Sequence, residues 1–511
     1  MTTDLQTPTD TTTGTADVDV LIVGAGISGI GCAWHLQHEQ PGKSYKILEA
    51  RDAMGGTWDL FRYPGIRSDS DLHTFGYVFK PWTNEKSIAD GPDIRGYIEE
   101  TARENGIDRH IAFGKRVLSA EWSSADALWT TTVEDVATGE TTTTTSRWLF
   151  SACGYYRYDE GFTPHFEGTD RFQGQIIHPQ HWPEDLDYTG KKVVVIGSGA
   201  TAVTLVPAMA EKTESITMLQ RSPSYILPLP SKDPIANALR SRLGEKRAYA
   251  ITRKKNIYRQ MALYGLSQKF PNAVRKVIRK VNEQQLKGSS LDVDVHFKPT
   301  YDPWDQRLCA VPDADLYKTL RRGKATVVTD HIDTFDETGI RLKSGRHLDA
   351  DIIVTATGLN LLAFGGIQLK VDGEDVSLPD TVAYKSFMLS GVPNFAFAVG
   401  YTNSSWTLKV DLVCEHLAKL IGLMDARGVD AAVPELAESR MEKRPLLDFK
   451  AGYVLRSLED FPKQGVDEPW SLAMSYAKDA KRLQKGPVED PHLRLFSASS
   501  TRTAATAPVA A

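Results

Sequence analysis

Two glycine-rich turns in this chain have the spacing that accommodates the pyrophosphate of a dinucleotide. The first reads GAGISG and the second GSGATA, each between an apolar run and a segment with helical periodicity. The first glycine of such a turn allows a sharp reversal, the second lets the backbone approach a phosphate, and the third position keeps the helix close to the sheet. The residues in these places are Gly24, Gly26 and Gly29 in the first turn and Gly197, Gly199 and Ala202, beside Thr201, in the second. Two such turns predict two nucleotide cofactors that exchange electrons.

The residue after the next strand predicts which nucleotide each turn binds. After the first turn, the strand Tyr45–Leu48 ends at Glu49, whose carboxylate can accept the hydroxyl groups of an adenosine ribose and disfavours a 2′-phosphate. After the second turn, the corresponding strand leads to Arg221 and Ser222, and a guanidinium with a neighbouring hydroxyl can bind a ribose 2′-phosphate. The second site is therefore predicted to select NADPH over NADH.

The segment that follows Glu49 indicates FAD at the first turn. It reads ARDAMGGTW, and its glycine pair, which includes Gly56, lets the chain pass close to a bulky planar ligand. Thr57 adds a hydroxyl group and Trp58 an aromatic edge. This combination favours FAD over NAD.

The sequence also supplies the elements that must hold these turns. Apolar, β-branched runs at Val18–Val23 and Lys191–Ile196 precede the turns, and helical periodicity follows at Ile30–His38 and Thr204–Ala210. The predicted fold class is therefore α/β, with two Rossmann-like dinucleotide-binding domains. The Thr-rich, alternating stretch Leu118–Leu149 predicts two antiparallel strands in a small sheet over the first domain.

Length and composition set the class of protein. The 511 residues exceed what a single hydrophobic core usually holds, so two or three domains are expected. The net charge of -5 gives no general attraction to nucleic acid. The four cysteines are scattered without metal-ligand spacing, which predicts no metal site and a reduced, cytoplasmic protein. No segment approaches the roughly 18 apolar residues of a transmembrane helix, and the ends, 1–17 and 497–511, are predicted to be disordered.

A longer set of motifs resembles one family. The segment before the second turn reads FQGQIIHPQHWP, Phe172–Pro183, and resembles the FxGxxxHxxxW fingerprint, followed by P or D, of type I Baeyer–Villiger monooxygenases. The GGTW segment, YPGIRSDSD at Tyr63–Asp71 and ATG at Ala356–Gly358 resemble the same family, from about residue 18 to about residue 480. The stretch Ser386–Lys409 is most similar to the subgroup that includes the ethionamide-activating monooxygenases.

The resemblance implies an NADPH- and O2-dependent flavoprotein monooxygenase. In this family NADPH reduces FAD, a C4a-peroxyflavin forms, and one oxygen atom enters beside a ketone carbonyl to give an ester or lactone. The same intermediate oxidises thioethers, so a ketone or thioether is the expected substrate and sulfoxidation an expected side activity. An N- or S-oxygenating flavin monooxygenase of the same fold is the alternative. A disulfide reductase is disfavoured because the chain has no CxxC pair.

The resemblance also implies residue roles. Arg307, in YDPWDQRLC, is similar to the family's catalytic arginine, which stabilises negative charge beside the flavin. Asp69 matches the carboxylate that orients this arginine near FAD, and Asp71 is the rival acid. Gln306 replaces a lysine that contacts the nicotinamide ribose in many relatives, and Trp406 is expected to contact NADP. The linker residues expected to couple cofactor binding to domain movement are Phe172, Gly174, His178 and Trp182.

The motifs divide the chain into domains. The expected parts are an FAD domain of 1–150 and 357–511, a linker of 151–187, an NADP domain of 188–225 and 325–356, and a helical insertion of 226–324. Between Lys232 and Lys287 the insertion carries fifteen Lys or Arg against three acids. This stretch is either a solvated helical face near the NADPH entry or a peripheral contact with an anionic membrane. The sequence leaves both open and does not indicate the oligomeric state.

Overall fold

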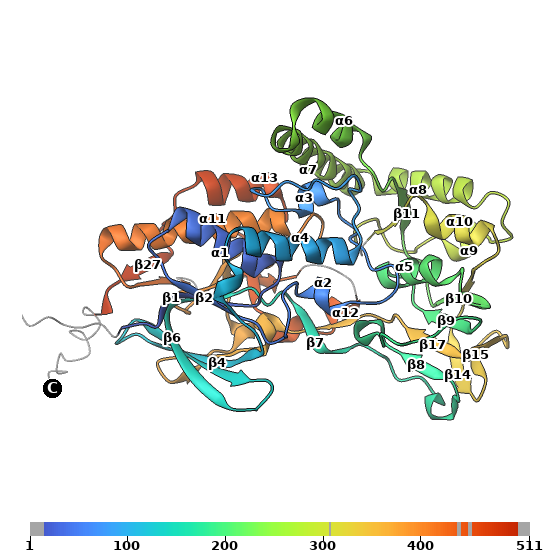
Figure 1. The fold of residues 1–511 in the computed structure, drawn as a ribbon, viewed down its shortest axis with the longest axis horizontal. Helices are drawn as coiled ribbons and strands as arrows, with labels where there is room; N and C mark the ends of the chain where they lie inside the picture. Colours follow the sequence, from blue (N-terminus) through green and yellow to red (C-terminus); the bar gives the residue numbers. More distant parts are fainter. Residues whose placement is uncertain (1–14, 306–307, 437–440, 448–451, 499–511) are drawn as a thin grey trace, which may run out of the picture.

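The computed structural model describes residues 15–305, 308–436, 441–447 and 452–498. Two sheets lie side by side, with helices packed around them and a helical lobe above (Figure 1). The predicted α/β class is confirmed. Most of both predicted disordered ends lies outside the described residues. Their inner residues Asp17 and Ala498 are hydrogen-bonded through their backbone amides, to Thr145 and Asp430 respectively.

The first sheet is built around β1 (Val18–Val23). This strand pairs in parallel with β2 (Tyr45–Leu48) on one side and β6 (Thr141–Ser151) on the other. The helix α1 (Ile27–Glu39) makes the crossover between β1 and β2. Since the strand is covered on both faces, its residues read as a continuous apolar run and Val20 through Ile22 are fully buried. The predicted first strand–turn–helix–strand unit is confirmed.

The Thr-rich stretch forms a hairpin, but not a separate sheet. β4 (Lys115–Ser123), β5 (Leu128–Asp135) and β6 pair antiparallel. β6 is long enough to extend beyond this hairpin and pair with β1, which merges the hairpin into the main eleven-stranded sheet. The predicted antiparallel pairing is present, but the stretch contributes to three strands where two were expected, and they belong to the main sheet and do not form a small sheet over it. The other strands of this sheet are β3 (Ile111–Ala112), β19 (Gln368–Val371), β20 (Glu374–Asp375), β21 (Ala383–Tyr384), β22 (Met388–Leu389) and β23 (Phe395–Phe397).

The second sheet surrounds the second turn. Its strands, all parallel, follow the order β13 (Thr326–Thr329), β10 (Ser215–Gln220), β9 (Lys192–Ile196), β17 (Ile352–Thr355) and β8 (Gln175–Ile177). The helix α5 (Ala200–Met209) connects β9 to β10. The edge strand β8 comes from the linker predicted at 151–187, so part of that linker is built into the second sheet. A three-stranded antiparallel sheet, β14 (Ile332–Asp336), β15 (Gly339–Leu342) and β16 (His347–Asp349), follows β13.

The insertion contacts both halves of the molecule. Its elements are β11 (Ile226–Leu229), α6 (Pro234–Leu243), α7 (Glu245–Lys269), α8 (Pro271–Gln285), α9 (Val293–His296), β12 (Cys309–Pro312) and α10 (Asp315–Arg321). α7 packs on α3 (Leu72–Phe75) of the first domain, and α10 packs on α5 of the second. The lobe formed by α6 and α7 stands above α3 and α4 (Gly91–Glu104) in Figure 1. Among the residues that the structure describes, no helix combines the length and apolarity needed to cross a membrane.

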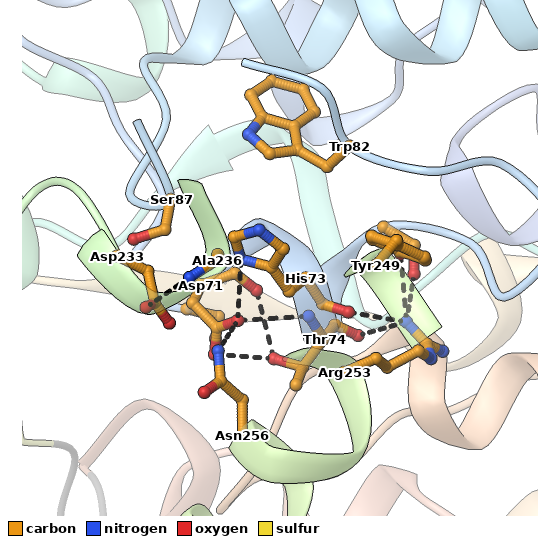
Figure 2. A network of polar contacts seen from close by, with 12 residues as sticks. Asp71, His73, Thr74, Trp82, Ser87, Asp233, Ala236, Tyr249, Arg253 and Asn256 are labelled. Atoms are coloured by element: carbon orange, nitrogen blue, oxygen red, sulfur yellow. Dashed lines mark hydrogen bonds and ion pairs between the residues drawn. The ribbon is translucent and has the colours of Figure 1, made fainter. Parts of the chain in front are cut away.

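One buried arginine fastens the insertion to the first domain. Arg253 of α7 donates hydrogen bonds to the backbone carbonyl oxygens of His73, Thr74 and Gly76 at 2.7–3.2 Å (Figure 2). Its second terminal nitrogen forms a 2.9 Å ion pair with Asp411 of α11 (Thr407–Arg427). Because all these groups are buried, their interactions are mutually dependent.

The remaining elements lie mainly near the C-terminal part of the chain. They are α2 (Thr57–Leu60), β7 (Tyr156–Gly161), β18 (Leu359–Leu361), β24 (Ala431–Pro434), β25 (Lys443–Pro445), α12 (Gly452–Leu455), β26 (Lys463–Gly465), α13 (Tyr476–Asp479) and β27 (Leu493–Phe496). β24 pairs with β27, and β25 with β26, which holds this part of the chain against the first domain.

His416 is expected to make stability depend on pH. It is fully buried on α11, donates from Nδ1 to the Leu483 carbonyl oxygen at 2.8 Å, and burial lowers its pKa to about 4. The unfolded chain takes up this proton near pH 6.5, whereas the native protein resists until about pH 4. The free energy of unfolding should therefore fall as pH is lowered through this window, by about 2 kcal/mol at pH 5. Urea unfolding at several pH values gives the free energy of unfolding as a function of pH. This dependence on pH should be weaker in His416→Asn than in the parent protein, and an identical dependence in both would contradict the role of His416.

Candidate active site between the two sheets

A cavity of about 1520 Å³ runs between the two sheets and beneath the insertion. It is bounded by segments from the first domain, the second domain and the helices α7 and α8. The sequence-predicted residues that line it are Gly24, Gly26, Glu49, Gly56, Thr57, Trp58, Asp69, Thr201 and Trp406. The cavity therefore reaches from the first nucleotide turn to the start of α5, where Thr201 lines it. The other residues predicted for the second site do not line it: Gly197, Gly199, Ala202, Arg221 and Ser222.

The first turn presents an open helix N-terminus to this cavity. Gly24 has φ +105°, a backbone conformation that residues other than glycine rarely adopt. A Cβ on Gly29 would lie 1.9 Å from the Gly24 carbonyl oxygen, so only glycine allows this close packing. Gly26 caps α1 without any side-chain hydrogen bond, so the amides of the first turn are free to bind an anion.

Glu49 is held at the edge of this turn. Its carboxylate accepts hydrogen bonds from the backbone amides of Ala25 at 2.7 Å and Arg51 at 3.0 Å. Burial raises the pKa of Glu49, while these two amides and the Arg51 side chain act in the opposite direction. Each oxygen keeps a lone pair for another donor, such as a ribose hydroxyl.

The GGTW segment lies directly against the first turn. Gly56 has φ +57°, and a Cβ there would lie 3.2 Å from the Gly26 Cα, so the two backbones meet without side chains between them. Asp59, on α2, is fully buried and binds Arg51 at 2.5 Å and both Arg62 and Arg95 at 3.1 Å. Sequence reasoning missed Asp59. The sequence pattern that could have indicated it is an acid directly after GGTW, with Arg51 before it and Arg62 after it in the chain.

The two rival acids differ in their surroundings. Asp71 caps α3, and its oxygens accept hydrogen bonds from Thr74 and from Asn256 at 2.9 Å (Figure 2). They also accept one from Gln260 at 2.8 Å. These contacts tie Asp71 to α7, which gives it a structural task. Both Asp69 and Asp71 line the cavity, so the contacts with α7 and not the cavity position distinguish Asp71. Gln306 and Arg307 lie outside the described residues.

The second turn is also an open helix N-terminus. Gly199 caps α5 without a side-chain hydrogen bond, and a Cβ there would meet nothing within 4 Å. Ser198 Oγ donates to the Ser222 carbonyl oxygen at 3.1 Å, which holds the turn beside the end of β10. Arg221 is exposed at this point and forms no ion pair with any residue that the structure describes. The turn and the guanidinium can therefore bind two separated phosphates.

The linker motif lies where the chain crosses between the sheets. The chain passes from the first sheet to the second through β7 and returns from the second to the first through β18, and these two strands pair antiparallel. His178 Nε2 donates to the Gly358 carbonyl oxygen at 3.1 Å, and its ring packs so closely on Gly161 that a Cβ there would lie 1.9 Å from the ring. Burial lowers the pKa of His178. Phe172 and Trp182 pack in the cores of the second domain.

The loop before α11 is held by its polar side chains. Ser404 Oγ donates to Gln260 Oε1 at 2.9 Å, and Asn403 Nδ2 donates to the Met474 carbonyl oxygen at 3.0 Å. Trp406 Nε1 donates to Ser28 Oγ at 2.8 Å in the first turn of α1. Trp406 thus lines the cavity on the side of the first nucleotide turn. Its predicted contact with NADP stays a prediction.

These features define a class of protein. Two helix N-termini without a side-chain cap, each after a strand that pairs in parallel with its neighbours, open into one cavity and form the architecture of a two-nucleotide oxidoreductase. Comparison with family models agrees: residues 22–84 match the NAD(P)-binding Rossmann-like domain, and residues 88–368, more than half of the chain, match the flavin-binding monooxygenase-like family. The chain belongs to this family of flavin-binding monooxygenases.

Individual relatives are similar over nearly their whole length. The chain is 54% identical over 481 residues to the FAD-containing monooxygenase EthA of Mycobacterium tuberculosis, covering 94% of this chain and 98% of the relative. It is 48% identical over 494 residues to the probable FAD-binding monooxygenase AlmA of Acinetobacter baylyi, covering 96% and 98%. The fold is similar to that of OTEMO, solved with FAD and NADP, with a TM-score of 0.74, 22% identity, and coverage of 94% and 100%. The predicted flavin monooxygenase is thus confirmed.

Proposed function

We propose that this protein is an NADPH-dependent Baeyer–Villiger monooxygenase that contains FAD. It consumes one O2 and one NADPH for each ketone, inserts one oxygen atom beside the carbonyl to give an ester or lactone, and releases the other as water. The observation that carries the proposal is the cavity that extends from the first nucleotide turn to Thr201, at the start of the helix that follows the second turn. A hydride donor, a flavin and a substrate need such a common space to react in sequence.

The residues on the cavity wall fit both cofactors. The glycine contact between Gly26 and Gly56 leaves a path for a dinucleotide along α1, and Glu49 retains acceptor sites for its ribose. The open space above Gly199 and the exposed Arg221 suit NADPH. When bound, FAD supplies the oxidation and oxygen-activation chemistry and NADPH supplies the electrons.

The chain's own residues then orient the reactants and exclude water. Asp69 lines the cavity and, in this proposal, orients Arg307, whose fixed positive charge stabilises the negative charge that develops on the substrate oxygen. The loop containing Asn403 and Trp406 covers the site through hydrogen bonds to α1, α7 and the Met474 backbone. His178 couples the two crossings of the chain, so that cofactor binding in one domain is transmitted to the other.

Incubation of the purified holoprotein with NADPH, O2 and a simple ketone tests the reaction. The expected product is the ester with one oxygen atom from ¹⁸O2. A protein that oxidises only thioethers or amines would instead be the N- or S-oxygenating alternative. A disulfide reductase is not favoured, because none of the four cysteines forms a disulfide and burial raises the pKa of the cavity-lining Cys153 thiol to about 12.

Arg221 is expected to decide between NADPH and NADH. Arg221→Ala removes a charge-assisted hydrogen bond to the 2′-phosphate, worth about 1.5–3 kcal/mol, so the KM for NADPH should rise roughly 10- to 150-fold. The KM for NADH should stay unchanged, because NADH has no phosphate at this position. Steady-state NAD(P)H oxidation measures both constants, and an equal effect on the two cofactors would exclude this role.

We also propose that the protein works in the cytoplasm without a membrane anchor in the insertion. Unbridged cysteines support a reducing compartment. Several of the fifteen basic side chains of the insertion already have polar partners in the protein: Lys232, Arg240, Arg253, Lys255, Arg275 and Arg279. This pairing favours the solvated helical face over a membrane contact. Co-sedimentation with anionic vesicles at moderate salt would contradict it.

A further inference from the structure

The part of the cavity wall that the insertion forms carries large apolar side chains that are exposed. Leu263 and Leu266 of α7 are 55% and 52% exposed, Phe270 is 50% exposed, and Val277 of α8 is 63% exposed. All four side chains line the cavity. Large apolar side chains gathered on one concave wall indicate that an apolar ligand covers them.

Polar contacts at two positions along α7 fix the rotation of this helix about its axis. Asn256 and Gln260 donate hydrogen bonds to Asp71, and further along the helix Ser267 Oγ accepts one from Trp304 Nε1 at 3.2 Å. Residues at these spacings share one helix face, so the stretch between them faces the cavity. From residue 259 to residue 270 the helix rises about 16 Å. The apolar wall is therefore an extended groove.

Within the described parts of the chain, one positively charged side chain in this groove has no acidic partner. The other lysines and arginines that line the cavity are each within 4.0 Å of an acid: Arg51, Arg67, Lys115, Arg116, Lys232 and Lys255. Arg259 lines the same cavity one turn before Leu263 and is exposed. It has no hydrogen bond or ion pair with any part of the chain that the structure describes. A guanidinium in this situation is suited to binding a carboxylate through two parallel hydrogen bonds.

We propose that the substrate is an amphiphilic ketone, with an apolar body along α7 and α8 and an anionic group bound by Arg259. This inference rests on the proposed oxygenation and adds the substrate class and its specificity-determining residue. The apolar wall gains affinity from each methylene that it covers, about fourfold per methylene. The anionic group fixes the position of the molecule, and with it the position of the carbonyl.

The test compares keto acids with their methyl esters in the holoprotein. The series varies the number of methylenes between the carbonyl and the carboxylate. For the acids that span the groove, kcat/KM should exceed that of the ester by about tenfold, mainly through KM. Arg259→Gln should remove this preference and leave kcat for a short neutral ketone unchanged. The matched control is Lys254→Gln, which removes the same charge from an exposed position of α7 that does not line the cavity.

The outcomes separate this inference from the proposed function. If neutral ketones give esters but Arg259→Gln affects acid and ester equally, the amphiphilic substrate is excluded and the Baeyer–Villiger proposal stands. A rise in the KM for NADPH, with no change for the keto acid, would make Arg259 a cofactor contact and overturn the inference. If no ketone is oxygenated, calorimetric binding of an alkanoate and the matching alkanol still decides the matter. Tighter binding of the alkanoate, lost in Arg259→Gln but kept in Lys254→Gln, supports the inference, and equal affinities overturn it.

Discussion

Arg253→Met is expected to lower the free energy of unfolding by about 3–5 kcal/mol. The substitution keeps most of the apolar stem but removes the ion-pair partner of buried Asp411 at 2.9 Å, which leaves, among the described residues, only His35, at 3.7 Å, as its charged neighbour. It also removes the donor to the three carbonyl oxygens at residues 73, 74 and 76. Since these groups join α7 to α3 and α11, the loss affects the contact between the insertion and the first domain. The urea midpoint of the purified holoprotein measures it.

A neighbouring residue gives the control for this prediction. Lys254→Met makes the same change in charge on the exposed side of α7 and should shift the free energy of unfolding by less than about 0.5 kcal/mol. Adding Asp411→Leu to Arg253→Met should recover part of the lost stability, because the buried carboxylate that has lost its closer ion-pair partner is removed as well. If Arg253→Met unfolds at the same urea concentration as the parent, the buried ion pair has no structural role.

Arg307→Ala is expected to separate NADPH oxidation from ester formation. Loss of a fixed positive charge at the reacting oxygen costs about 2.7–4 kcal/mol, so ester formation should slow roughly 100- to 1000-fold. Reduction of the flavin needs no such charge and should continue, with the electrons appearing in hydrogen peroxide. Product chromatography and a peroxide assay, run on the same reaction, measure the two pathways.

The conservative variant tests what Arg307 contributes. Arg307→Lys keeps the charge but loses the planar fork of donors, so its ester yield should lie between those of the parent and the alanine variant. FAD content should stay at one per chain in both variants if the residue acts on the reaction alone. A variant that forms ester at the parental rate would exclude the role, and one that loses FAD would indicate a structural role.

The parts of the site that the sequence predicted are local in the chain. Each nucleotide turn consists of a strand, a turn and a helix in succession, and the spacing of glycines within it reflects contacts between near neighbours, such as that of Gly29 with Gly24. Glu49 was predicted because it ends the strand that follows the first turn. The antiparallel pairing of the Thr-rich stretch was predicted, but its merging into the main sheet was not, since the pairing of β6 with β1 joins residues far apart in the sequence.

The parts that sequence reasoning missed depend on contacts between distant segments. Asp69 and Asp71 could not be distinguished by spacing alone, whereas the hydrogen bond from Asn256 to Asp71 joins residues 185 positions apart. Only the structure shows that Asp59 forms ion pairs with Arg51, Arg62 and Arg95. Arg259 is one of fifteen basic residues in a charged stretch of sequence. Its significance depends on the acids paired with the other basic residues that line the cavity, whereas Arg259 has no such partner among the residues that the structure describes.

The sequence alone predicted two nucleotide sites, because glycine spacing and strand-end charges act within single supersecondary units, and the resemblance of its longer motifs, such as Phe172–Pro183, indicated the flavin monooxygenase family. The tertiary structure decided how those units share one cavity, which acid caps a helix, and which wall of the cavity is apolar. These features arise when side chains from segments hundreds of residues apart are packed together and form hydrogen bonds and ion pairs with one another. Such contacts depend on distance in space, which spacing along the chain does not specify.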